Sequence, residues 1–378
     1  MRRFCLFIVI LLLIVGVVHS GTSISITEFC PDPYLYDDVD EYVVLSGNGL
    51  LDGITVSDGR GGFRFPPGTR INGTLTIARN GPAFLQSHGK LPDFEWLDYS
   101  PVVPNVINGD PLRLANTGDE LLLYKGSELI QRVAWPKDVK PRKGQVHYFE
   151  NGAWDFRPLM IGQSRFLPAI FHNVNVTTFV SPDCSSEMFT YAVDHASDEI
   201  LLNVYEFSSP AMADSLIAAR DRGVNVSVLL EGGPVGGISP EEQSAIWRMN
   251  TGGIPVRQMV SGKEVHAPYR YDHAKYVVFD RRAVLLTSEN FKYSGFPPAG
   301  FNSNRGWGVY LEDPALAGYF STVFLADSSG PSVIPANGRQ GNPEPVPAGK
   351  HTVEFTPAHF SGATVSPVLA PDTSSQII

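Results

Sequence analysis

The stretch EILLNVYEFSSPAMADSLIAARDRGVNVSVLL, residues 199–230, decides the fold. Its two ends, 199–207 and 224–230, are nearly continuous apolar runs of the kind that form buried strands. Between them, Ser209 and Pro210 are residue types that begin a helix, and Gly223 is a type that ends one. The stretch therefore predicts a strand, a helix and a second strand, which together form the unit of an α/β layer structure.

The same alternation continues toward the C-terminus. The run Ser239-Pro-Glu-Glu242 has capping-box spacing and predicts another helix, which the glycines at 252–253 end. We expect further strands at 254–260, 274–279, 283–287 and 308–311, and a helix at 314–326. Residues 166–328 are therefore assigned to one α/β region. Residues 329–350 are rich in Pro, Gly, Ser and Asn, and we interpret them as a linker.

The chain upstream of this region has a different pattern. From 24 to 135, short segments of alternating apolar and polar residues are separated by turn clusters such as 46–49 and 58–62. Residues 119–135 are expected to form one hairpin that turns at 125–127. The period of two, without a long helical pattern, predicts an antiparallel β-sandwich.

Five short pieces of this upstream region carry a family resemblance. They are Ile26-Thr-Glu-Phe29, Glu41-Tyr-Val-Val44, Phe65-Pro-Pro-Gly-Thr69, Asn116-Thr-Gly-Asp-Glu-Leu121 and Val133-Ala-Trp135. Over residues 22–165 the chain resembles the lamin-tail domain. The resemblance implies an immunoglobulin-like sandwich that acts as a binding or positioning module, and the alternative is a spacer without a ligand.

The first twenty residues form a separate segment. Arg2 and Arg3 precede an uncharged run at 4–18, and a small residue follows at Ser20, which is the pattern of a secretory signal peptide at 1–20. The run is shorter than the roughly 20 residues of a membrane span, so an uncleaved anchor is the alternative. We therefore expect an extracellular or cell-surface protein. Its two remaining cysteines, at 30 and 184, either pair with each other or are separate buried thiols.

The charge of the chain restricts its partners. The 378 residues include 29 Lys and Arg against 39 Asp and Glu, a formal net charge of −10 that loss of the first 20 residues would make −12. Such a surface disfavours general electrostatic binding to nucleic acid or anionic lipid. Residues 256–310 differ, because they hold eight basic and four acidic residues. This local positive excess predicts an anion site.

The residues suited to chemistry lie in that basic stretch, in HAKYVVFD at 273–280 and TSEN at 287–290. On a strand, His273 and Lys275 project from the same face, and Asn290 lies at the end of the next strand. The mixture suits a phosphodiester: Lys275 and Asn290 can hold non-bridging oxygens, and His273 offers a nitrogen nucleophile with a pKa near neutrality. No metal-ligand motif is evident, so we predict that no metal and no other cofactor is needed.

The two pieces together resemble the phospholipase D superfamily signature His-x-Lys-x4-Asp-x6-Gly-Ser-x-Asn, with Thr287 where the family has Gly. The resemblance covers about residues 170–330, which is one half-domain of that family. It implies that His273 is the nucleophile or the general acid, and that Asp280 has a structural role or orients a histidine. The implied site residues are His273, Lys275 and Asp280 as catalytic, and Lys275, Ser288 and Asn290 as phosphate-binding.

The chain holds one copy of this motif, whereas a phosphohistidine mechanism needs two histidines, one to attack and one to protonate the leaving group. We expect the second from a homodimer mate or from a separate second half-domain. The run Pro371-Asp372-Thr-Ser-Ser375 repeats Pro182-Asp183-Cys-Ser-Ser186 with one change. Residues 351–378 are therefore a candidate start of a truncated second half-domain, with a chance match as the alternative.

The sequence thus predicts an exported, phospholipase D-like phosphodiesterase that acts on a phospholipid or a nucleic acid. Its fold class is multidomain, with an immunoglobulin-like β-sandwich followed by an α/β half-domain. The alternative from another class is a non-catalytic surface binding protein in which the α/β half-domain is a relic.

Overall fold

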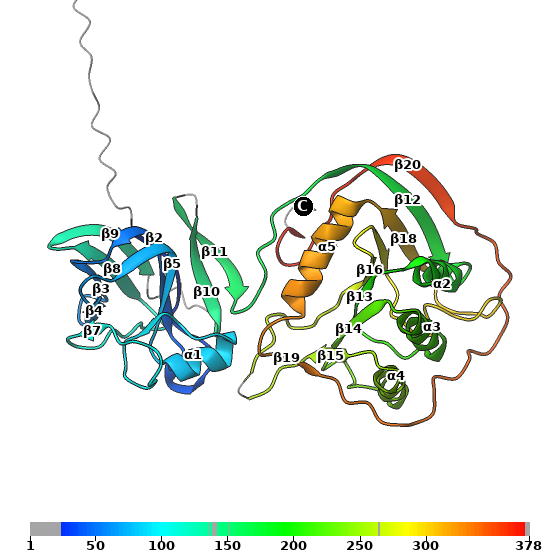
Figure 1. The fold of residues 1–378 in the computed structure, drawn as a ribbon, viewed down its shortest axis with the longest axis horizontal. Helices are drawn as coiled ribbons and strands as arrows, with labels where there is room; N and C mark the ends of the chain where they lie inside the picture. The colour runs from blue at the N-terminus through cyan, green and yellow to red at the C-terminus, as the bar shows by residue number, and fades with distance from the viewer. Residues whose placement is uncertain (1–23, 136, 138–141, 151, 264, 375–378) are drawn as a thin grey trace, which may run out of the picture.

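The computed structural model describes residues 24–135, 137, 142–150, 152–263 and 265–374 (Figure 1). The predicted signal segment at 1–20 lies outside the described residues. Within the described part, no helix is long and apolar enough to cross a membrane. A part built mainly of strands ends at Met160, and a mixed α/β part begins at Phe171.

The α/β part is organised around one nine-stranded sheet. In spatial order its strands are β19 (Val333–Pro335), β15 (Val256–Met259), β14 (Asn225–Glu231), β13 (Glu199–Val204), β16 (Lys275–Phe279), β17 (Ala283–Thr287), β18 (Gly306–Glu312), β12 (Phe171–Ser181) and β20 (Ala358–Val365). Strands β13, β14 and β15 are parallel, whereas every other neighbouring pair is antiparallel.

The stretch that predicted the α/β layer forms the centre of this sheet. Strand β13 is followed by helix α3 (Pro210–Asp221) and then by β14, which pairs with β13 in parallel. The helix begins where predicted, because the Ser209 Oγ accepts a hydrogen bond from the backbone N–H of Met212. Gly223 follows the helix with a φ of 100°, a conformation that favours glycine. The predicted strand–helix–strand unit is confirmed.

Helices cover both faces of the sheet (Figure 1). On one face, α2 (Ser185–His195), α3 and α4 (Pro240–Thr251) pack over a core that includes Phe189, Leu202 and Val277. On the other face, α5 (Pro314–Asp327) packs over a second core that includes Tyr276 and Phe320. Alternate residues of β16 enter the two cores, as expected for a strand buried on both sides.

The N-terminal part holds two sheets. The six-stranded one has the order β11 (Ala153–Met160), β10 (Gln145–Glu150), β1 (Ser25–Cys30), β2 (Tyr42–Leu50), β5 (Arg70–Ala78) and β6 (Phe94–Glu95). The five-stranded one has the order β7 (Ile107–Asn108), β4 (Gly62–Arg64), β3 (Ile54–Ser57), β8 (Asp119–Lys125) and β9 (Glu128–Trp135). The short helix α1 (Gly81–His88) and a 3-10 turn at Tyr36–Asp38 connect strands.

One apolar core joins the inner faces of these two sheets. It includes Phe29 and Leu45 from the six-stranded sheet and Val56 and Leu121 from the five-stranded sheet. The hairpin expected at 119–135 is present as β8 and β9. Two facing sheets agree with the predicted sandwich architecture, while its immunoglobulin-like and lamin-tail character remains a prediction.

Residues 329–350 are not the free linker that their composition suggested. Strand β19 within this segment pairs with β15, and Ala336 is buried beside it. Further along, the Arg339 N–H donates to the Gln243 carbonyl, and the Glu344 carboxylate accepts from Tyr293 N–H. The sequence of this segment has no periodic pattern because the segment runs across the surface of the α/β part as an extended strap.

Residues 351–374 also belong to the sheet. Strand β20 pairs antiparallel with β12 along almost its whole length. Beyond one end of this pair, the Asp183 carboxylate accepts the N–H groups of Glu354 and Phe355 at 2.7 and 3.2 Å, and beyond the other end the Asp372 carboxylate accepts the N–H of Phe166 at 2.6 Å. The repeated Pro-Asp runs therefore occupy matching positions at the two ends of one two-stranded seam.

The two cysteines lie in different cores. Cys30 is buried in the N-terminal part and Cys184 in the α/β part, and both are free thiols. Of the two alternatives left by the sequence, the structure has separate buried thiols.

Asp183 lies at one end of the seam formed by β12 and β20, and its side chain is fully buried. Burial alone raises its pKa, but the two N–H donors, His351 and Arg305 lower that pKa well below its usual range. We expect Asp183→Asn to lower the free energy of unfolding by about 2–4 kcal/mol at neutral pH, because a buried charged acceptor is lost. Urea unfolding would measure this change.

A depressed carboxylate pKa stabilises the fold above the unfolded-state pKa, and this contribution is lost as pH falls through the folded-state value. The difference between wild type and Asp183→Asn should therefore shrink in acid. Asp221→Asn, at an exposed carboxylate, is the matched control. Equal unfolding energies for Asp183→Asn and this control would contradict the structural role.

Candidate functional site

The polar residues of the site meet at one edge of the nine-stranded sheet because β16 runs against its neighbours. Strand β16 is antiparallel to both β13 and β17. Its first residue, Lys275, therefore lies beside Val204, the last residue of β13. On its other side, the end of β17 at Thr287 lies at the same edge. Residues that precede β16 and residues that follow β13 and β17 consequently share one site.

His273 and Lys275 are brought together at this edge. His273 precedes β16 and is exposed, whereas Lys275 is half-buried. The Lys275 Nζ lies 3.4 Å from both ring nitrogens of His273. The ring of Tyr205 lies 4.6 Å from the imidazole, centroid to centroid, and 5.4 Å from the Lys275 Nζ. An imidazole, an ammonium and an aromatic ring thus form a compact cluster.

The electrostatics of this cluster favour a neutral imidazole. Burial and the Lys275 charge lower the pKa of His273, and the Glu206 carboxylate opposes them. Burial also lowers the pKa of Lys275, against the raising effect of nearby carboxylates such as Glu206. A neutral ring carries a free nitrogen lone pair, which is the form that can attack an electrophile.

Ser288 and Asn290 follow β17 as predicted. Ser288 is exposed, and its Oγ accepts the Trp307 N–H at 3.1 Å. Asn290 is half-buried, and its Nδ2 donates to the Glu206 Oε2 at 2.6 Å. The Thr287 hydroxyl, where the phospholipase D signature has Gly, donates to the Trp307 carbonyl at 3.1 Å. This threonine is therefore tied to the neighbouring strand β18.

Asp280 lies away from this cluster. It follows the opposite end of β16 from Lys275, and its carboxylate accepts the N–H groups of Ser197, Asp198 and Glu199 at 2.8–2.9 Å. Burial raises its pKa, but these hydrogen bonds lower it further, so that the net change is downward. The structure thus separates Asp280 from the residues with which the signature groups it, and favours the structural one of its two expected roles.

Sequence reasoning did not assign three residues to the site. Tyr205 and Glu206 directly follow β13, and Lys292 follows Asn290 by two positions. The Glu206 Oε2 accepts from the Lys292 Nζ at 3.2 Å as well as from Asn290. Their position in the sequence was the available signal. Tyr205 and Glu206 lie near the end of the apolar run at 199–207, directly after the buried strand, where side chains reach the edge of the sheet.

A cavity of about 900 Å³ opens beside His273 and Lys275. Its walls are largely apolar. The apolar side chains come from β12, β17, β18, α5, β20 and the segment after β20: Val176, Leu286, Val309, Leu311, Phe320, Val323, Val365, Val368 and Leu369. Three carboxyls, Asp272, Asp327 and Asp372, also line it. Burial raises the pKa of Asp272 to about 6 and that of Asp327 to about 8. The wall at Asp327 is therefore largely uncharged at neutral pH.

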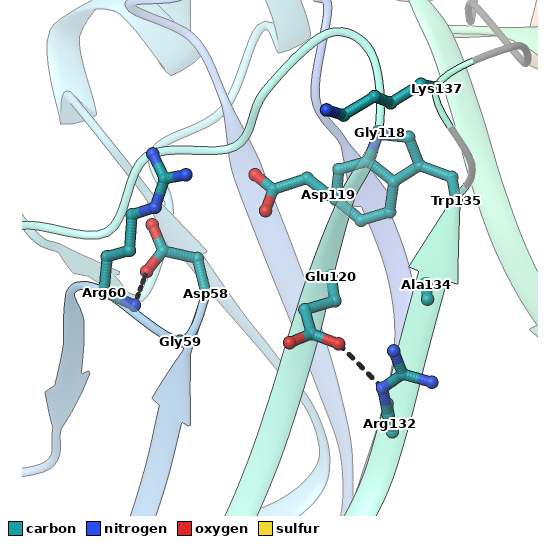
Figure 2. A pocket seen from close by; sticks show the side chains of 10 residues that line it. All are labelled: Asp58, Gly59, Arg60, Gly118, Asp119, Glu120, Arg132, Ala134, Trp135 and Lys137. Carbon is teal, nitrogen blue, oxygen red and sulfur yellow. Dashed lines mark hydrogen bonds and ion pairs between the residues drawn. The ribbon is translucent and has the colours of Figure 1, made fainter.

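A different hollow, of about 600 Å³, lies in the N-terminal part. Figure 2 shows its charged side chains, with Glu120 paired to Arg132 and the Asp58 carboxylate bound to the backbone N–H of Arg60. Acidic and basic groups both line it, and the Trp135 ring forms part of its wall. Among the described residues that line it there is no histidine, cysteine or serine, and so no nucleophile of the kind found at His273.

Among the described residues, no three His, Cys, Asp or Glu side chains are placed to hold a metal ion together. The charge at the site edge comes instead from side chains. Lys275 and Lys292 are its cations, and Glu206 and Glu289 are nearby carboxylates that act on Lys275. The arrangement can bind an anion and present a neutral nitrogen nucleophile to it.

Residues 190–328 match the family model described as "Cardiolipin synthase, PLD-like domain". This part of the chain is therefore a phospholipase D-like domain, and members of that superfamily are phosphodiesterases. The match includes every residue of the site described above, from Tyr205 to Asn290 and Lys292. A search of curated proteins found no match.

Three solved structures are similar in shape. Nuc, a phospholipase D family member from Salmonella typhimurium, is 21% identical over 46% of this chain and 100% of its own, with a TM-score of 0.37. NucT from Helicobacter pylori is 13% identical over 43% and 99%, with a TM-score of 0.35. Phosphatidylserine synthase from Haemophilus influenzae is 15% identical over 44% and 40%, with a TM-score of 0.32.

The position of Asp280 predicts a stability effect that is separable from the site. We expect Asp280→Asn to lower the free energy of unfolding by about 1–3 kcal/mol, because a charged acceptor of three backbone N–H groups is lost. Asparagine also tolerates the φ of 53° at this position, which limits backbone strain. Thermal unfolding measures the loss, with the exposed Asp194→Asn as control. An unchanged melting temperature would contradict the structural role.

Proposed function

We propose that the chain is a phosphodiesterase subunit in which His273 attacks the phosphorus of the substrate. The observation that carries this proposal is the 3.4 Å contact between the Lys275 ammonium and the His273 ring, at the edge of a phospholipase D-like domain. The ammonium can bind a phosphate oxygen while it helps to keep the ring neutral. Binding and activation of the nucleophile thus come from one contact.

In the proposed reaction, a ring nitrogen of His273 forms a bond to phosphorus and one P–O ester bond breaks. The leaving oxygen takes a proton from a second histidine, which acts as general acid. Water then attacks the phosphohistidine, the N–P bond breaks, and the proton of that water returns to the second histidine. Lys275 and Asn290 hold the non-bridging oxygens, with Ser288 as a further donor.

The second histidine has to come from outside the cluster around His273. The pairing of β12 with β20 supports a second half-domain as the source of this histidine, rather than a homodimer joined through two β12 strands. In such a homodimer the outer edge of β12 would have to be free, but β20 already covers it. The similar contacts of Asp372 and Asp183 support the same choice, because a second half-domain that began at Asp372 would repeat the role that Asp183 has at the head of this one. Either source completes the two-histidine mechanism.

The cavity beside His273 supports a lipid phosphodiester as substrate. Its walls offer aliphatic side chains and Phe320, and Asp327 is largely neutral at neutral pH. Burying an alkyl chain there contributes about 0.8 kcal/mol per CH₂. A nucleic acid would instead need a basic groove and stacking platforms. The substrate proposed is therefore a phosphate ester with at least one long alkyl or acyl chain.

The remaining expectations complete the proposal. The N-terminal part would act as a binding or positioning module of the lamin-tail type, and the protein would be exported through its first twenty residues. Both rest on the sequence patterns described above. A lipid substrate agrees with a protein at a cell surface.

The mechanism predicts that hydrolysis of an aryl phosphodiester depends on His273. His273→Ala should lower kcat by at least about 1000-fold, because the nucleophile is lost, while EDTA should leave the rate unchanged. Release of nitrophenolate from bis(p-nitrophenyl) phosphate measures both. His266→Ala is the matched control, since His266 stacks on Tyr34 outside the cluster.

Full activity of His273→Ala, or loss of activity in EDTA, would contradict the mechanism. If the unsubstituted chain neither hydrolyses the ester nor assembles beyond a monomer in solution, a homodimer is excluded as the source of the second histidine. If a supplied second half-domain also fails to produce hydrolysis, the non-catalytic binding alternative is favoured, because one histidine cannot perform both steps.

If the substrate carries a long chain, a larger side chain in the cavity wall should slow its hydrolysis. Val309→Trp places a bulky ring in the apolar wall and should lower kcat/KM for a long-chain phospholipid on the order of 50-fold, equivalent to about three excluded methylenes. Hydrolysis of the aryl ester, which has no alkyl chain, should change little. Val102→Trp, at an exposed valine of the N-terminal part, is the control. Equal effects on both substrates would contradict a chain-binding cavity.

A further inference from the structure

We propose that Glu206 is a positioning residue of this site: its carboxylate orients the amide of Asn290 and the ammonium of Lys292, and it maintains the charge balance around His273. The inference rests on the proposed function for the reaction that it serves. The contacts that support it can be tested without any assay of that reaction.

The first support is the pair of hydrogen bonds to one carboxylate oxygen. The Glu206 Oε2 accepts from the Asn290 Nδ2 at 2.6 Å and from the Lys292 Nζ at 3.2 Å. A carboxylate can only accept, so the nitrogen of the amide, and not its oxygen, must face Glu206. Its second N–H remains available to a phosphate oxygen. Glu206 therefore determines which atom of Asn290 can act as a donor.

The second support is the way the backbone holds these residues. The Phe291 N–H donates to the Glu206 carbonyl at 3.0 Å, and the Phe291 carbonyl accepts the N–H of Ser208 at 3.0 Å. These two hydrogen bonds join the segments that follow β13 and β17, at the end of β16 where Lys275 lies. The side chains of Glu206 and Lys292 are only 22% and 31% exposed, so their ion pair is screened less than a surface pair. The contact has a fixed geometry.

The third support is electrostatic. Lys275 and Lys292 would leave an empty site strongly positive, and the nearby carboxylates of Glu206 and Glu289 reduce that charge. Of these two, Glu206 also acts on the imidazole: burial and Lys275 lower the pKa of His273, and Glu206 raises it. A single carboxylate that bonds to the donors rather than to the substrate can therefore adjust the protonation of the nucleophile.

The experiment compares Glu206→Gln with Glu199→Gln by following the His273 ring in a ¹H–¹³C NMR titration of the full chain. The His273 signal is the one lost in His273→Ala. Glu206→Gln keeps the size of the side chain and removes its charge, so the pKa of His273 should move down. The acid limb of activity should move to lower pH with it. Glu199, at the other end of β13 and paired with Arg281, controls for loss of a carboxylate on the same strand.

Kinetics separates positioning from stability. Glu206→Ala removes the acceptor as well as the charge, and it should lower kcat roughly 10- to 100-fold with KM changed less than threefold, because the amide of Asn290 is no longer oriented. Glu206→Gln, which keeps an acceptor, should recover part of this loss. A fall in melting temperature alone would not produce that difference between the two variants.

A His273 pKa in Glu206→Gln equal to that in wild type would overturn the inference, and so would kinetics of Glu206→Ala equal to those of Glu199→Gln. If Glu206→Ala does not fold, the titration of Glu206→Gln decides. If the wild-type chain shows no phosphodiesterase activity either alone or together with a second half-domain, the proposed function fails, while the titration still shows whether Glu206 acts on the imidazole.

Discussion

The antiparallel insertion of β16 between β13 and β17 is the constraint on which the site depends. Parallel strands would carry His273 and Lys275 to the edge opposite Val204, because the start of one parallel strand lies beside the start of the next. With β16 reversed, its first residue pairs with the last residue of β13. His273, which we propose as the nucleophile, then shares one edge with Lys275 and with the residues that follow β13 and β17.

The same reversal separates the motif into two functions. One end of β16 presents Lys275 beside His273, and the other end presents Asp280 to the backbone of the segment before β13. Asp280 therefore stabilises the strand whose opposite end forms the site. The motif is continuous in sequence, but one end of it lies at the site of the proposed chemistry and the other end contributes to the stability of the fold.

The sequence predicted this arrangement only as far as local patterns reach. The run at 199–230 predicted the strand, helix and strand of the centre, because its buried strands and helix caps are local signals. The convergence of His273 and Lys275 followed from their spacing, although His273 lies before the strand rather than on it. Asp280 was grouped with them because a spacing along a strand does not say which end faces a site.

Other features could not be predicted because they depend on tertiary contacts. Residues 329–350 have no periodic pattern, since an extended strap follows the surface that it crosses. Glu206 has no motif of its own, and its role depends on Asn290 and Lys292, more than eighty positions away. The repeat at Asp183 and Asp372 was visible in the sequence, but its meaning required the pairing of β12 with β20.

The seam and the site are connected through the cavity. The end of β20 and the segment after it supply Val365, Val368 and Leu369 to the cavity that His273 also lines. The same cavity is lined by the half-buried ammonium of Lys275, which is poorly solvated there and is stabilised when an anion approaches it. An apolar molecule without a charge would leave Lys275 unpaired, and an inorganic anion would leave the walls in contact with water. A phosphate ester with a long chain would satisfy both surfaces at once, which is the physical basis of the proposed substrate class.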